Sequence, residues 1–248
     1  MSRVMLITGA SRGIGAATAR LAAAQGYALC LNFHNRQDAA QQLLGELKST
    51  GTHAIAVAAD VANEVQVARL FAAIDNEFGR LDVLVNNAGM LEHQMRLDEM
   101  NAARLMRVFA VNVTGSFLCA REAVKRMSTR YGGIGGAIVN VSSIAAKLGA
   151  PGEYIDYAAA KGAIDSMTLG LAKEVAAEGI RVNAVRPGVI RTEIHASGGE
   201  PGRVERVKAS VPIGRGGEPE EVAEAILWLA SEKASYTSGA LLDVSGGR

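Results

Sequence analysis

Short apolar runs alternate along this chain with longer stretches in which apolar residues recur at helical spacing. The runs are too short for typical helices and rich in Val, Ile and Leu, which predicts strands. The predicted strands cover residues 3–7, 28–33, 54–59, 81–85, 137–141, 180–185 and 240–244. The stretches between them predict helices over 16–25, 37–50, 65–78, 155–178 and 218–230, with one or two more within 97–127.

This alternation indicates the fold class. Parallel strands need crossover connections, which helices usually supply. We therefore predict an α/β fold with one doubly wound, seven-stranded parallel sheet. A chain of 248 residues can bury a large core as one unit, so we expect a single domain over residues 1–248.

Composition excludes several classes of function. The chain has 26 Lys and Arg residues against 25 Asp and Glu residues, for a net charge of +1. Because both signs are scattered along the chain, no electrostatic footprint for nucleic acid is indicated. The longest apolar runs are too short to span a bilayer, and no signal-peptide pattern follows Met1. We expect a soluble, cytoplasmic protein that binds neither membrane nor nucleic acid.

Cysteine and histidine usage indicates neither a disulfide nor a metal site. Cys30 and Cys119 are far apart in apolar contexts, which predicts two reduced core thiols. The short spacings that metal sites use are absent among the histidines, which are His34, His53, His93 and His195. No metal is therefore predicted.

A glycine-rich turn follows the first predicted strand and precedes the first predicted helix. It reads Thr8-Gly-Ala-Ser-Arg-Gly-Ile-Gly15. Glycines let the backbone approach a pyrophosphate closely, and the free N–H groups at a helix start face the anion. A structural turn is the alternative. The phosphate-binding interpretation involves Gly9, Ser11, Arg12, Gly13, Ile14 and Gly15.

Tyr157 and Lys161 lie four residues apart in the predicted helix 155–178. Residues at that spacing share one helix face, so the phenol and the ammonium are neighbours. A nearby cation favours a phenolate and lowers its pKa, which would let Tyr157 exchange a proton near neutral pH. A purely structural pair is the alternative. Ser142 and Ser143 end the strand before this helix on opposite faces, so only one of them can reach a substrate.

The glycine turn and the Tyr157-x-x-x-Lys161 stretch resemble the short-chain dehydrogenase/reductase family, in its branch of about 250 residues, and the resemblance covers essentially the whole chain. It implies a Rossmann-like fold and a catalytic set of Asn112, Ser143, Tyr157 and Lys161, in which Asn112 holds a water. One departure is the spacing: Ser143 and Tyr157 are 14 residues apart, one more than in many family members.

The resemblance also implies cofactor contacts at strand ends after the glycine turn. Asp60 and Val61 would meet the adenine, while Tyr157 and Lys161 belong to the cofactor site as well as the catalytic set. The remaining expected contacts are Asn87, Ala88, Gly89, Pro187, Gly188, Ile190 and Thr192. An ordinary turn remains the alternative at Asp60 and at Asn87.

The end of the second predicted strand indicates which nicotinamide cofactor is used. NAD-binding folds place a carboxylate there to bind the ribose hydroxyls, whereas a basic residue accommodates a 2′-phosphate. Here the strand ends in Asn32-Phe-His-Asn-Arg36, with no carboxylate before Asp38. Together with Arg12 in the glycine turn, this favours NADP over NAD, with Asn32, His34, Asn35 or Arg36 assisting. Ordinary solvated arginines are the alternative.

These patterns predict an NADP-dependent oxidoreductase that moves hydride between nicotinamide and a carbonyl or secondary alcohol. A 3-oxoacyl thioester, a sugar or polyol and a small ketone remain open as substrates. A non-catalytic NADP-binding regulatory or structural protein is the alternative, which the presence of both Tyr157 and Lys161 disfavours. The Gly-, Ser- and Pro-rich residues 193–211 are a candidate substrate lid. The resemblance further implies a homotetramer or homodimer.

Overall fold

The computed structural model describes residues 2–248, and its centre is one sheet of seven parallel strands. The strand order is β3-β2-β1-β4-β5-β6-β7. The predicted fold class is therefore confirmed. The strands are β1 (Val4–Ile7), β2 (Ala28–Phe33), β3 (Ala54–Ala58), β4 (Val83–Asn86), β5 (Gly136–Val141), β6 (Ile180–Pro187) and β7 (Leu241–Val244). The single-domain prediction spans 1–248, of which Met1 lies outside the described residues.

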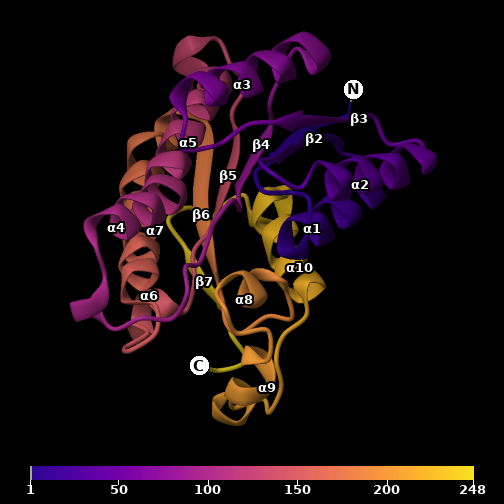
Figure 1. Ribbon diagram of the computed structural model, residues 1–248. Helices are drawn as coiled ribbons and strands as arrows, with labels where there is room; N and C mark the ends of the chain where they lie inside the picture. Colours follow the sequence, from indigo (N-terminus) through magenta and orange to yellow (C-terminus); the bar gives the residue numbers. More distant parts are fainter. Residues whose placement is uncertain (1) are drawn as a thin grey trace.

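Helices cover both faces of the sheet, as Figure 1 shows. The central strands are buried on both faces and therefore read as continuous apolar runs. One face is covered by α1 (Gly13–Ala24), α2 (Gln37–Ser49) and α10 (Pro219–Ala230). The other face is covered by α3 (Glu64–Phe78), α5 (Gly115–Met127) and α7 (Ile155–Glu174), with α4 (Ala102–Phe109) packed against α7. None of the helices within residues 2–248 is long and apolar enough to cross a bilayer.

The order of the strands sets the position of the pocket. β1 pairs with both β2 and β4, so the chain leaves the sheet centre in opposite directions on either side of β1. The loops after β1 and β4 diverge at this point, and open α/β sheets bind ligands in the crevice that results. The loops after β5 and β6 start from the same edge of the sheet, because all the strands are parallel. The sequence-predicted motifs are thus brought to one side of the molecule.

Three segments differ in detail from the sequence-based expectation. The predicted 97–127 helical region is divided into a 3₁₀ turn (Leu97–Glu99), α4, a π-helical turn (Ala110–Thr114) and α5. The loop before α7 contains a short helix, α6 (Ala145–Leu148). The predicted lid contains α8 (Ile194–Ser197), α9 (Arg203–Val207) and a 3₁₀ turn (Lys208–Ser210). Figure 1 shows α8 and α9 beyond the edge of the sheet.

Candidate active site

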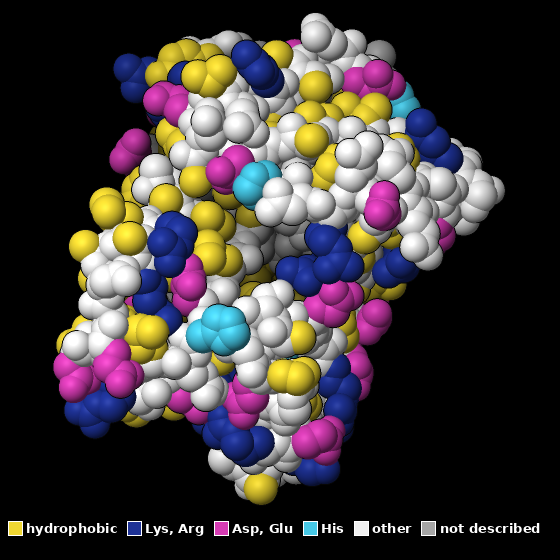
Figure 2. Space-filling view, in the orientation of Figure 1, with side chains coloured by type: hydrophobic (Ala, Val, Ile, Leu, Met, Phe, Trp, Pro, Cys, Tyr) yellow, Lys and Arg dark blue, Asp and Glu magenta, His cyan; other side chains and the backbone are white. Residues whose placement is uncertain are grey.

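A pocket of about 900 Å³ opens at the carboxyl edge of the sheet. Figure 2 shows it as a hollow near the middle of this face, with Lys and Arg side chains on one rim and hydrophobic side chains on the opposite rim. Its walls come from the ends of β1, β2, β4, β5 and β6, from α7 and from the predicted lid. Every sequence-predicted site residue lines this pocket except Asn112 and Gly15.

The glycine turn fits against the end of β4. A Cβ atom on Gly9, whose φ is +61°, would lie 2.9 Å from the Ala88 Cα, and one on Gly15 would lie 2.6 Å from the Asn87 Nδ2. The side chain of Arg12 does not cap α1, so the N–H groups of the first helical turn have no side-chain acceptor. A free helix start beside a close-packed turn suits a pyrophosphate.

Two asparagines hold this turn in place. Asn32 is buried, and its Nδ2 donates to the carbonyl of Ala59 at 3.0 Å while its Oδ1 accepts from the Gly9 N–H at 3.3 Å. Asn87 Nδ2 donates to the carbonyl oxygens of Thr8 and Gly9 at 2.8 and 3.0 Å. Asn32 therefore uses its amide to join β2, β3 and the turn, which leaves it little capacity for the predicted cofactor contact.

Arg12 and Arg36 converge at the β2 end of the pocket. The Nη1 atom of Arg12 lies 3.0 Å from the Glu193 Oε2, and the Nη1 atom of Arg36 lies 3.6 Å from the same oxygen. Both arginines line the pocket, as do His34 and Asn35 beside them. Two guanidinium groups that approach one oxygen favour the binding of an anionic group between them. Residue 193 was predicted only as the start of a lid, so its role between the arginines was missed.

Asp60 and Val61 lie on the same side of the pocket, after β3. Asp60 accepts a hydrogen bond from the Ala62 N–H at 3.0 Å, and its own N–H donates to the Gln66 Oε1 at 2.8 Å. These bonds fix the turn into α3, which agrees with the alternative that Asp60 serves an ordinary turn. The second carboxylate oxygen remains available to a ligand.

The two serines after β5 face opposite directions, as strand geometry predicts. Ser142 is buried and its hydroxyl donates to the Lys161 carbonyl at 3.1 Å. Ser143 lines the pocket and lies near the Tyr157 hydroxyl. The chain between Ser143 and Tyr157 forms α6 and a turn at Ala150, whose φ of 45° is unusual for a residue with a side chain.

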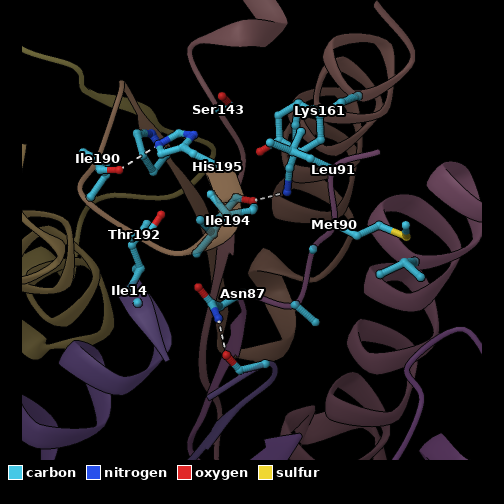
Figure 3. Close-up of a pocket in the computed structure, with 18 of the residues that line it drawn as sticks. Ile14, Asn87, Met90, Leu91, Ser143, Lys161, Ile190, Thr192, Ile194 and His195 are labelled. Atoms are coloured by element: carbon cyan, nitrogen blue, oxygen red, sulfur yellow. Dashed lines mark hydrogen bonds between the residues drawn. The ribbon is translucent and has the colours of Figure 1, made fainter. Parts of the chain in front are cut away.

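Tyr157 and Lys161 lie in the first turns of α7, and Lys161 crosses the tyrosine ring. The Lys161 Nζ is 5.5 Å from the ring centroid and donates to the Val141 carbonyl at 2.7 Å, a bond drawn in Figure 3. The Lys161 side chain is only 4% exposed. The amine is thus held between β5 and α7 and points into the pocket wall.

The expected effect of Lys161 on Tyr157 is wrong for this structure. Burial raises the pKa of Tyr157 to about 12, and the Ser143 hydroxyl opposes this rise only in part. Burial also lowers the pKa of Lys161 to about 8, against the opposing charge of Asp165. Removing water from the phenolate therefore sets the direction in which the pKa of Tyr157 moves. Tyr157 thus keeps its proton at neutral pH, which suits it to donate that proton.

Asn112 lies in the π-helical turn between α4 and α5 and is fully buried. Its Nδ2 donates to the carbonyls of Met90 and Val108 at 3.1 and 2.9 Å, and its Oδ1 accepts from the Met90 N–H at 3.2 Å. A Cβ on Gly89 would lie 2.9 Å from that Oδ1 and 3.6 Å from the Lys161 Nζ. Asn112 therefore fixes the chain after β4 next to Lys161, and its carbonyl oxygen retains a second lone pair.

The segment after β6 forms the wall opposite Tyr157. The Gly188 N–H donates to the Val244 carbonyl at 2.9 Å, and Ile190 pairs with Gly217. These contacts fix the positions of Pro187, Gly188, Ile190 and Thr192, all of which line the pocket. Figure 3 shows Ile190 and Thr192 on the same side as Ile14 of the glycine turn.

Sequence reasoning missed several pocket residues on the substrate side. Most are apolar, and nothing in their spacing distinguishes them from ordinary core or loop positions. The missed residues include Met90, Leu91, Leu148 and Tyr154, whereas Ile194, His195 and Arg203 belong to the segment that was predicted only as a lid. Within residues 2–248, no group of three or more His, Cys, Asp or Glu side chains is arranged to hold a metal ion.

Known proteins resemble this chain over nearly its full length. A sequence model of the family described as "Enoyl-(Acyl carrier protein) reductase" matches residues 9–248. The oxidoreductase YgfF of Escherichia coli (strain K12) is 56% identical over 245 residues, which are 99% of each chain. The cis-4-hydroxycyclohexanecarboxylate dehydrogenase of Sinomonas cyclohexanicum is 45% identical over 99% of this chain and 96% of its own.

A solved structure also superposes on the whole fold. It is the crystal structure of 3-ketoacyl-(acyl-carrier-protein) reductase from Brucella melitensis complexed with NADH. The TM-score is 0.92 at 33% sequence identity, and the match covers 99% of this chain and 98% of that chain. The similarity therefore includes the glycine turn, the pocket and the last strand.

Proposed function

Because the chain belongs to the short-chain dehydrogenase/reductase family of oxidoreductases, we propose that it transfers a hydride between NADP and a carbonyl compound or secondary alcohol. The observation on which this rests is the grouping of Ser143, Tyr157 and Lys161 at one end of a pocket that has the glycine turn and Arg12 at the other. The names of two similar proteins, a hydroxy-acid dehydrogenase and a ketoacyl reductase, support a carbonyl or alcohol substrate.

The pocket residues fit a dinucleotide along its length. The first turn of α1 and the glycine turn would hold the pyrophosphate, and Asp60 with Val61 would hold the adenine. Lys161 would bind the hydroxyls of the nicotinamide ribose, with Ile190 and Thr192 at the carboxamide. When bound, NADPH supplies the hydride for reduction, and NADP accepts it in the reverse direction.

The chain's own residues supply the proton and the orientation. Ser143 donates a hydrogen bond that holds the substrate oxygen, and Tyr157 protonates that oxygen. A phenol whose pKa is raised to about 12 is fully protonated at neutral pH, which suits donation in the direction of reduction. Asn112 would hold the water through which Lys161 exchanges protons with solvent. Ser143 thus positions the substrate oxygen that Tyr157 protonates, and Asn112 positions the water through which the proton is replaced.

A substrate screen tests this function directly. We expect NADPH oxidation or NADP reduction with at least one member of a panel of ketones, acyl thioesters, sugars and quinones. Tight NADPH binding without turnover of any member would instead favour the alternative, a non-catalytic NADP-binding protein.

The preference for NADP is supported by the arginines at the β2 end. Arg12 and Arg36 meet at a single carboxylate oxygen, and the strand end carries no carboxylate that would repel a 2′-phosphate. The neighbouring His34 and Asn35 add polar groups without negative charge. The NADH in the similar Brucella melitensis structure is bound to that protein and supports a nicotinamide cofactor here.

Arg12→Ala is expected to raise the Kd for NADPH about tenfold to a hundredfold, because a hydrogen bond to a charged group contributes about 1.5–3 kcal/mol. The Kd for NADH should change little, because NADH has no 2′-phosphate. Fluorescence titration with both cofactors measures the two constants. Arg20→Ala, which removes an arginine paired with Glu46 on the outer side of α1, is the matched control and should affect neither. Equal losses for the two cofactors would refute the assignment.

Glu193→Gln is expected to lower the Kd for NADPH up to about fivefold, because the carboxylate competes with the 2′-phosphate for Arg12 and Arg36. The range corresponds to the 0.2–1 kcal/mol or so of an exposed ion pair. The effect should shrink as salt is added. Glu205→Gln, which removes a carboxylate paired with Arg191 and Lys208, serves as the control. Weaker NADPH binding by Glu193→Gln would contradict the competition.

We also propose self-association into a homotetramer or homodimer. Large apolar side chains on α4 and α5 support it, since Met106 is 66% exposed and Phe117 is 49% exposed. Large apolar side chains exposed on a surface can mark a protein interface.

A further inference from the structure

The chain after β7 reads Ser245-Gly-Gly-Arg248 and forms a tight turn. Gly246 and Gly247 have φ values of +65° and +92°, in the left-handed region that glycine tolerates. A Cβ on Gly246 would lie 2.8 Å from the Val211 Cγ1, and the Gly246 carbonyl accepts from the Ile213 N–H at 3.1 Å. Figure 1 shows this end of the chain, marked C, on the side of the sheet where α6 and α9 lie. The two glycines therefore pack the turn against the segment that follows the predicted lid.

Ser245 holds the turn against the pocket wall. Its Cα would lie 2.8 Å from a Cβ on Gly188, the wall residue that follows β6. Ser245 is buried, and its hydroxyl donates to the Arg248 carbonyl at 3.1 Å. Arg248 is half-buried and lines the pocket. Contacts of the backbone thus fix where Arg248 lies and leave its guanidinium available.

The strand order places Arg248 at the substrate end of the pocket. β7 is two places from β5, the strand that leads to Ser143, and five places from β2, the strand that leads to Arg36. Neighbouring strands lie about 4.8 Å apart, so the two separations are roughly 10 Å and 24 Å. Arg248 therefore lies on the side of the reacting carbonyl and far from the proposed place of the 2′-phosphate.

Arg248 differs from the other cations of the pocket because its guanidinium forms no hydrogen bond or ion pair with any residue that the structure describes. The other cations each have a partner for the charged group; they are Arg12, Arg36, Lys161 and Arg203. Asp243, the carboxylate closest to Arg248 along the chain, is already shared by Lys147 and Arg186, at 2.5 and 3.4 Å. A guanidinium without a partner in a pocket wall favours a carboxylate or a phosphate, whose oxygens match its planar donors.

We propose that Arg248 binds an anionic group of the substrate while Ser143 and Tyr157 hold the reacting carbonyl. The substrate class is then an oxo acid or a phosphorylated ketone, or the corresponding hydroxy compound, rather than a neutral ketone or sugar. This inference rests on the proposed function, because it concerns the substrate of the same site. Arg248 is a specificity-determining residue in this account, and the proton transfer remains with Tyr157.

Matched substrates with and without the negative charge test the inference. The oxo acids levulinate and 6-oxoheptanoate, each compared with its neutral amide, test a carboxylate at two distances from the carbonyl. Dihydroxyacetone phosphate compared with dihydroxyacetone tests a phosphate. The wild type is expected to favour the anionic member of at least one pair by about tenfold or more in kcat/KM, as a hydrogen bond between charged groups allows. Added KCl should reduce this ratio, because salt screens the charges.

Three variants locate the source of the preference. Arg248→Gln should bring the ratio close to one through a higher KM for the anionic member, with little change in kcat or in the constants of the neutral member. Arg248→Lys keeps the charge and should retain part of the preference. Lys147→Gln removes a cation of α6 that is paired with Asp243 outside the pocket, and it should leave the ratio unchanged. The Kd for NADPH should remain near the wild-type value in all three variants.

Several results would overturn the inference. They are a wild-type ratio near one for every pair, a ratio unchanged in Arg248→Gln, or equal losses on both members of a pair. A raised Kd for NADPH in Arg248→Gln would also do so, because it would assign the guanidinium to the cofactor. Turnover of the neutral members without any preference for the anionic ones refutes only the role of Arg248. Absence of turnover with these pairs and with every carbonyl of the wider panel refutes the proposed function as well.

Discussion

Tyr157→Phe is expected to lower kcat for carbonyl reduction by about 10²–10⁴-fold, the usual contribution of a positioned general acid. The substitution removes only the hydroxyl, so the ring should keep its place under the Lys161 amine. The pKa of Tyr157, raised to about 12 by burial, means that the proton is present at neutral pH and is lost with the hydroxyl. Steady-state NADPH oxidation with the best substrate of the panel measures the effect.

Cofactor binding distinguishes lost chemistry from lost structure in this experiment. The Kd for NADPH should change by less than about threefold in Tyr157→Phe, since a phenol hydroxyl contributes little beyond one neutral hydrogen bond. Tyr131→Phe is the matched control, because Tyr131 is 60% exposed and lies away from the pocket. Turnover of Tyr157→Phe within tenfold of the wild type would remove Tyr157 from the proposed mechanism.

Arg104→Met is expected to lower the free energy of unfolding by about 3–5 kcal/mol, the cost of leaving one partner of a buried ion pair alone. Arg104 is 4% exposed and Asp156 is 2% exposed, and the Arg104 Nε donates to the Asp156 Oδ2 at 2.7 Å. The same guanidinium donates to the His93 carbonyl at 2.6 Å. The pair therefore joins α4, the start of α7 and the loop after β4. Urea denaturation measures the loss.

Two comparisons identify the burial of the pair as the cause. Arg96→Met breaks an exposed pair with Asp98 and should cost less than about 1 kcal/mol. The double variant Arg104→Met with Asp156→Leu removes both charges and should recover part of the loss. Asp156 also accepts a hydrogen bond from the Tyr157 N–H at 2.9 Å. Because this bond helps to position Tyr157, kcat of Arg104→Met should fall along with its stability. A loss below 1 kcal/mol in Arg104→Met would show that the pair does not hold α4 to α7.

The sequence predicted the sheet and the principal pocket residues because these depend on local patterns. Apolar runs identify strands without reference to the rest of the chain, and the alternation with helices determines that the strands are parallel. The glycine turn lies where a strand meets a helix, and Tyr157 and Lys161 are neighbours by helical spacing alone. The period of a strand also places the Ser142 hydroxyl on the Lys161 carbonyl and leaves the Ser143 hydroxyl free to face a substrate.

The features that the sequence did not predict depend on contacts between distant segments. The pKa of Tyr157 follows from burial of the phenol, which helical spacing cannot reveal, and so its direction was predicted wrongly. Asn32 was expected at the cofactor, but its amide is engaged by the turn and by β3. Glu193 lies 181 residues from Arg12 along the chain, and no local pattern marks such a pair.

The central claim is that Tyr157 protonates a substrate oxygen while hydride passes from NADPH to the carbon that bears it. The most direct test is a single-turnover reaction with NADPH deuterated at the transferred C4 position, followed by mass spectrometry of the alcohol. With wild-type protein, the account predicts deuterium on the carbinol carbon. With Tyr157→Phe, the labelled alcohol should form about a hundredfold more slowly or slower still. Alcohol without the label, or equal rates for the two proteins, would contradict it.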